Sequence, residues 1–80
     1  MRPELEKAAA EVELLTRKRN RVRDELLDVE ADLRSIRDPH IRRNLDRQRR
    51  ELKNAYIGLA AELLRAQREL SRIQQAGWRP

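Results

Sequence analysis

A heptad repeat of apolar residues runs through the first half of the chain. From Leu5 to Ile36, seam residues recur at alternating intervals of three and four, and Arg19 is the only polar residue among them. Such a long seam, uninterrupted by Gly or Pro, is typical of a coiled-coil helix. Pro3 and the acids after it suit a first turn, so a helix over residues 3–37 is predicted. The seam positions are Leu5, Ala8, Val12, Leu15, Arg19, Val22, Leu26, Val29, Leu33 and Ile36.

The segment Arg37-Asp38-Pro39-His40 is the strongest break inside the chain. Proline disfavours the helical conformation of the residue before it, here Asp38. Asp is a preferred N-cap and Pro is favoured at the first helical position. We therefore predict a turn over residues 37–39 and a second helix over residues 39–76.

A second seam, beginning at Leu45, follows the break, and its phase is shifted by two residues relative to the first. Two residues rotate the apolar stripe by about 200°, which fits a chain reversal better than a straight rod. After reversal the seams pair layer by layer, from Leu33 opposite Leu45 to Leu5 opposite Ile73. The second seam consists of Leu45, Arg49, Leu52, Tyr56, Leu59, Leu63, Ala66, Leu70, Ile73 and Gly77.

This pairing predicts an all-α fold, an antiparallel two-helix coiled-coil hairpin that spans residues 1–80 as one domain. Exposed side chains beside the seam are expected to form weak ion pairs between the helices. The expected pairs are Lys18–Glu62, Glu30–Lys53 and Arg37–Asp46.

Residues 77–80 are predicted to cap the second helix. Gly77 suits the left-handed position after a helix, and Pro80 prevents continuation of the helix. Trp78 has two interpretations: it packs on Ile73 as part of the cap, or it is an exposed anchor for a partner.

The composition excludes several classes of function. The chain has no Cys and one His, so we expect no metal site, and no cofactor or catalytic motif is recognisable. Charged residues make up 41% and aromatic residues 2%, which is typical of a coiled coil. No apolar run suits a signal peptide or a membrane span. We expect a cytoplasmic protein that is not an enzyme, with neither a membrane partner nor a small-molecule substrate.

Several uncharged residues remain outside the seams. Ile57 and Leu64 lie two helical turns apart, with small residues between them, and Leu27 of the first helix is expected on the same edge. Burial of this edge against a second copy would give a homodimer with a four-helix bundle. We call this set the apolar edge: Leu27, Ile57, Gly58, Ala60, Ala61 and Leu64.

Basic residues concentrate at the predicted reversal. Residues 34–53 contain eight basic and three acidic side chains, a difference equal to the whole net charge of +5. Arg suits contact with phosphate groups, so this region is a candidate site for anions or nucleic acid. We call its candidate arginines the basic tip: Arg34, Arg37, Arg42, Arg43, Arg47 and Arg50.

Arg19 and Arg49 occupy seam positions. Either their aliphatic stems lie on the seam while the charged groups reach water, or they fix the register of the helices at some cost in stability. For the whole chain, the leading hypothesis is a protein–protein interaction or assembly module that acts through the apolar edge. The alternative is binding of RNA or DNA through the basic tip.

Overall fold

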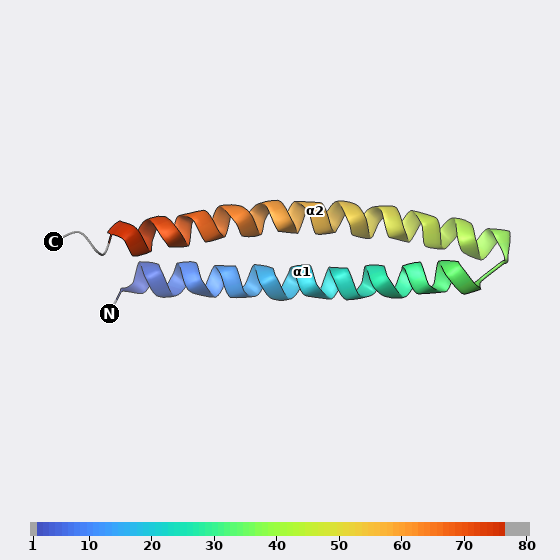
Figure 1. Cartoon of the computed structure of the whole chain (residues 1–80), viewed down its shortest axis with the longest axis horizontal. Coiled ribbons are helices and arrows are strands. Elements are labelled where there is room, and N and C mark those ends of the chain that lie inside the picture. Colours follow the sequence, from blue (N-terminus) through green and yellow to red (C-terminus); the bar gives the residue numbers. More distant parts are fainter. Residues whose placement is uncertain (1, 77–80) are drawn as a thin grey trace.

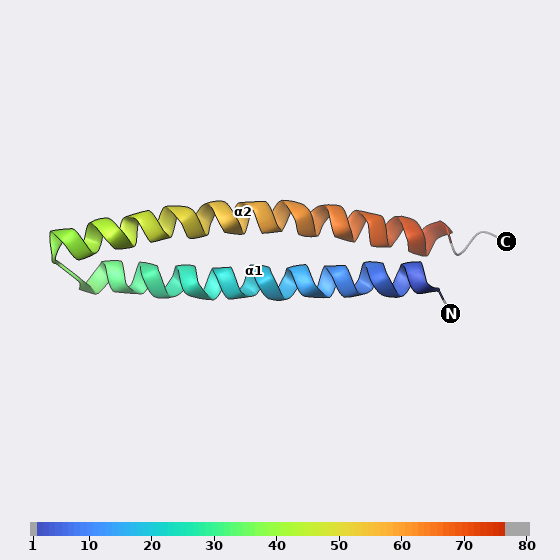
Figure 2. The ribbon, with the colours of Figure 1, turned by 180° about the vertical axis from the view of Figure 1, so that it is seen from behind.

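The computed structural model describes residues 2–76, which form an antiparallel helical hairpin (Figure 1). Helix α1 spans Pro3–Ser35 and helix α2 spans Pro39–Ala76. The hairpin measures 64 × 16 × 14 Å between Cα atoms, and α2 bows gently along α1 in both views (Figures 1 and 2). The predicted all-α hairpin is confirmed.

The predicted seams form the contact between the helices. Each seam residue from Leu5 to Ile36 and from Leu45 to Ile73 is buried or half-buried, including Arg19 and Arg49. The last seam residue, Gly77, lies outside the described residues. Burial is shallow, because only four hydrophobic side chains in the described part are classed as buried and none is less than 2% exposed. These four are Ala8, Leu15, Leu33 and Leu63.

The turn follows the predicted capping of α2. The Asp38 carboxylate accepts hydrogen bonds from the backbone N–H groups of His40 at 2.9 Å and Ile41 at 3.3 Å. It therefore satisfies two of the N–H groups that a helix start leaves unpaired. Pro39 takes the first helical position, where its missing N–H costs nothing.

Helix α1 ends two residues earlier than we predicted, at Ser35 instead of Arg37. Ile36 is already extended, with φ −86° and ψ 129°. Arg42 explains how the early end is stabilised, because its guanidinium donates hydrogen bonds to the carbonyl oxygens of Leu33 and Ile36. A cation at the C-terminal end of a helix also complements the helix dipole.

The ion pairs of the hairpin differ from those we predicted. None of the three interhelical pairs forms within residues 2–76, and the ion pairs seen along α1 and α2 each lie within one helix. Asp46 pairs with Arg49, one turn away, instead of Arg37. Exposed ion pairs are weak, so a neighbour on the same helix competes easily with one across the seam. The pairs that form are Glu13–Arg17, Arg23–Asp24, Asp46–Arg49 and Glu69–Arg72.

Candidate interaction surfaces

One groove shows which side chains of the two helices share a side of the hairpin. It is lined by Glu30, Leu33, Arg34, Arg49 and Lys53. Residues three, four or seven apart lie on the same side of a helix, so Leu27 extends this side from Glu30 on α1. Ile57 and Leu64 extend it from Lys53 on α2. The geometry thus brings Leu27 to the same side as the α2 part of the apolar edge.

The large side chains of the apolar edge are in water. Ile57 is 66% exposed, Leu27 54% and Leu64 49%. Gly58 is also exposed, and a Cβ atom placed there would have no neighbour within 4 Å. Ala61 is exposed and Ala60 is half-buried. The apolar edge is therefore an open surface on which a second helix could pack closely.

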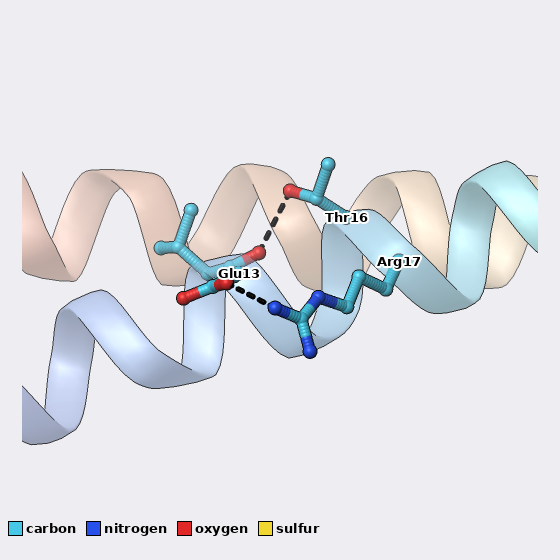
Figure 3. Close-up of polar contacts among 4 residues, drawn as sticks. Glu13, Thr16 and Arg17 are labelled. Atoms are coloured by element: carbon cyan, nitrogen blue, oxygen red, sulfur yellow. Dashed lines mark hydrogen bonds and ion pairs between the residues drawn. The ribbon is translucent and has the colours of Figure 1, made fainter.

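Polar residues of α1 beside the apolar edge are engaged within their own helix. Thr16 Oγ1 donates a 2.7 Å hydrogen bond to the backbone carbonyl of Val12, and Arg17 pairs with Glu13 (Figure 3). Asn20 accepts a hydrogen bond from Arg19 at 3.4 Å. Because the hydroxyl of Thr16 is satisfied locally, packing of a partner over it leaves no unpaired donor.

Arg19 and Arg49 reach from the seam toward the side of the apolar edge. Arg19 ends at Asn20, and Arg49 ends 3.5 Å from the Asp46 carboxylate with 41% of its side chain exposed. Their charged ends leave the seam, as expected for long side chains that lie along apolar surface. The Nε atom of Arg49 is buried without a hydrogen-bond partner, which carries a cost. The possible role of these arginines in fixing the register stays a prediction.

The basic tip divides into one structural arginine and a set of free ones. Arg42 is used to cap α1 and is not free for a ligand. The others are exposed and have no ion-pair partner within residues 2–76. Two nearby acids are already engaged, since Asp38 caps α2 and Asp46 pairs with Arg49. The free arginines are Arg34, Arg37, Arg43, Arg47 and Arg50.

Near the turn, the opposite side of the hairpin is acidic, a feature that sequence reasoning missed. A groove there is lined by Glu25, Asp28, Val29, Gln48, Glu51, Leu52 and Ala55. The basic side, with Arg34 and Lys53, lies across the seam from it. Seven-residue spacing could have revealed this segregation, because Arg43 and Arg50 share one side of α2 while Gln48 and Ala55 share the other.

Sequence reasoning also missed two exposed apolar residues. Leu14 is 52% exposed and Ile41 is 46% exposed. Leu14 follows Glu11 by three residues, and Glu11 lines a groove with Glu62 and Glu69, so the same helical spacing places Leu14 away from the apolar edge. Ile41 lies seven residues before Gln48 and thus on the acidic side. They are isolated hydrophobic residues of the kind that many surfaces carry.

The remaining features of the described residues concern metal sites, membrane spans and titratable groups. No group of three or more His, Asp or Glu within residues 2–76 is arranged to hold a metal ion. No helix in this range has the length and apolar content to cross a bilayer. Among residues 2–76, the exposed carboxyl group of Glu69 has its pKa lowered, mainly by its hydrogen bond from Arg72. Trp78 lies outside the described residues, so both of its interpretations stay open.

We compared the chain with known protein families, with characterised proteins and with solved structures, and found no match in any of them.

Proposed function

We propose that the chain is a non-enzymatic assembly module that forms a homodimer through its apolar edge. The observation that carries this proposal is the exposure of Leu27, Ile57 and Leu64, each about half exposed or more, on one side of the hairpin. Face-to-face packing of two hairpins would cover these side chains and further bury the seam beneath them. The product would be a four-helix bundle, in which core positions are enclosed by more than one neighbour.

The surface area of the hairpin supports association. Its accessible surface is 6750 Å², whereas a compact monomer of 9.5 kDa is expected to expose about 5,000 Å². The long and intermediate extents are 64 and 16 Å, and their product is about 1,000 Å², close to the roughly 800 Å² per partner of a standard interface. One side of the hairpin is therefore large enough for a stable dimer.

Acidic substitutions in the apolar edge test the proposal. We expect Ile57→Asp combined with Leu64→Asp to convert the dimer to a monomer, because two carboxylates per copy would be buried without partners. The matched control is Leu14→Asp, which changes a residue of similar exposure on the other side of the hairpin. Size-exclusion chromatography with light scattering gives the mass of each variant.

The control separates a specific interface from a general loss of solubility or helicity. The proposal predicts that the Leu14→Asp variant keeps the dimer mass, while the double variant has the monomer mass at the same concentration. Equal masses for the wild type and the double variant would contradict it. Circular dichroism checks that the variants stay helical.

A second candidate function is binding of the phosphate backbone of nucleic acid by the basic tip. The observation that favours it is the set of free arginines, which are exposed and have no ion-pair partner within residues 2–76. Guanidinium groups without internal partners are available to phosphate oxygens. The acidic side near the turn would restrict such contact to the basic side.

The salt dependence of binding tests this second candidate. Binding of random duplex DNA and of RNA should weaken steeply between about 50 and 200 mM salt, because phosphate contacts release counterions. Arg43→Gln with Arg50→Gln should reduce the slope of log K against log salt by about two. The control variant, Arg21→Gln with Arg68→Gln, removes the same charge elsewhere and should leave the slope unchanged. Absence of binding at the lower salt concentration would reject the candidate.

A further inference from the structure

The α2 part of the apolar edge has a spacing that is symmetric about its centre. Ile57, Ala60, Ala61 and Leu64 lie at intervals of three, one and three residues, so they form one stripe on α2. The order large, small, small, large is the same in both chain directions. A two-fold symmetric interface requires a surface patch that is complementary to itself. This stripe meets that requirement when two copies of α2 run antiparallel.

Two symmetric arrangements place the apolar-edge sides of two hairpins face to face. In the first, both turns lie at the same end, and α2 of each copy packs on α1 of the other. In the second, the turns lie at opposite ends, and α2 packs on α2. The two arrangements differ in which side chains meet and in where the charged ends lie, so the structure can distinguish them.

The side chains that meet favour the second arrangement. In the predicted layers, Arg19 lies opposite Leu59 and Leu15 opposite Leu63, which places polar α1 residues level with the apolar stripe. In the first arrangement Ile57 would therefore pack near Asn20 of the other copy, and Leu64 near its Glu13, which is charged and paired with Arg17. In the second arrangement Ile57 meets Leu64 of the other copy, and the small Ala residues meet at the centre.

The charge distribution favours the same arrangement. Near the turn, the apolar-edge side carries one free acid, Glu30, and a larger set of basic residues that are exposed and without ion-pair partners within residues 2–76: Arg34, Arg43, Arg50 and Lys53. The first arrangement would bring two such sets together, and juxtaposed like charges are strongly unfavourable at an interface. The second arrangement keeps them at opposite ends of the dimer. The α2 members of each set then lie toward the far end of the other α2, whose apolar-edge side carries the uncharged residues Gln67, Ser71 and Gln74.

We infer that the second copy binds antiparallel, with α2 packed against α2 and the two-fold axis between Ala60 and Ala61. This inference rests on the proposed homodimer and specifies the relative direction of its two copies. The result is a rod with one basic tip at each end. A ligand that recognises the basic tip would therefore find two separate sites on the dimer, facing away from each other.

Distances between spin labels test this polarity. The chain has no native Cys, so one introduced Cys per copy labels one position. A label in the Asn44→Cys variant lies near the turn, where antiparallel packing predicts a separation of about 50 Å between copies at 1.5 Å per residue along α2. Packing with both turns at the same end predicts less than about 30 Å, set by the width of two stacked hairpins.

A label at a second position distinguishes a dimer with both turns at the same end from a chain that does not dimerise. Arg65 is exposed and lies near the level of the inferred axis along α2, on the side of the hairpin that faces away from the interface. A label in the Arg65→Cys variant should therefore give a distance below about 35 Å in either arrangement. A long distance at position 44 with a short one at position 65 supports the inference. Short distances at both positions overturn the inference and leave the homodimer standing. A monomer mass without any distance between copies overturns the proposed function itself.

Discussion

Arg49 is the residue at which the seam departs most clearly from an apolar coiled coil. It lies opposite Val29 in the predicted pairing, and its guanidinium leaves the seam to pair with Asp46. Its Nε donor stays buried and unpaired. An unpaired buried donor lowers the stability of a protein by about 1–3 kcal/mol, whereas an exposed ion pair stabilises it by less than about 1 kcal/mol. The balance indicates that the guanidinium group of Arg49 does not stabilise the hairpin.

We therefore expect Arg49→Met to stabilise the protein by about 1 kcal/mol, because it keeps the aliphatic stem and removes the unpaired donor. Urea unfolding at fixed protein concentration measures the change. Arg68→Met, at an exposed position without an ion pair in the described residues, is the control and should shift stability by less than about 0.5 kcal/mol. A loss of stability in Arg49→Met would contradict this balance and show that Arg49 stabilises the hairpin.

Within helix α2, Gly58 is the position least suited to its element. It lies in the middle of a 38-residue helix, where Gly costs about 0.5–1 kcal/mol relative to Ala. Nothing in the hairpin requires its small size, because a Cβ atom there has open space. It also lies off the stripe formed by Ile57, Ala60, Ala61 and Leu64, so the inferred dimer does not require it either.

Gly58→Ala should accordingly raise the free energy of unfolding by about 0.5–1 kcal/mol and leave the dimer mass unchanged. Thermal unfolding followed by circular dichroism, together with the mass in solution, measures both effects. If Gly58→Ala weakened association or lowered stability, another chain would have to approach the backbone at this position.

At the level of the helices, much of the fold could be predicted from sequence. The spacing of three and four residues defined the seams, and Asp38-Pro39 defined the start of α2. The end of α1 could not be predicted, because it depends on Arg42, a side chain of the next helix that reaches back to two carbonyl groups. The ion pairs could not be predicted either, since exposed charges choose among partners that differ by only tenths of a kcal/mol.

For the candidate surfaces, the sequence pattern grouped residues into an apolar edge but could not measure their exposure. The set of exposed large hydrophobics includes Leu27, Ile57 and Leu64, as expected, but also Leu14 and Ile41. The basic tip was predicted as one group, whereas Arg42 is structural. These differences arise because a seam pattern predicts which residues lie inside, while the surface depends on side-chain contacts across the turn.

At the scale of the whole molecule, the hairpin is a long rod with a thin core. Its buried hydrophobic residues within the described part are few, and its accessible surface exceeds that of a compact monomer by about a third. Packing of two hairpins against each other would bury more hydrophobic residues and would also reduce the accessible surface of each chain. Stability should therefore rise with protein concentration, since a dimer is favoured by mass action.

Sedimentation equilibrium of the unmodified chain tests the central claim most directly, over a concentration range from about 1 to 100 μM that detects dimers with a Kd of about 1 μM or lower. The account predicts a mass approaching twice the 9.5 kDa of one chain, with helicity that falls on dilution as dimers dissociate. A stable, fully helical species of 9.5 kDa across the whole range would contradict it.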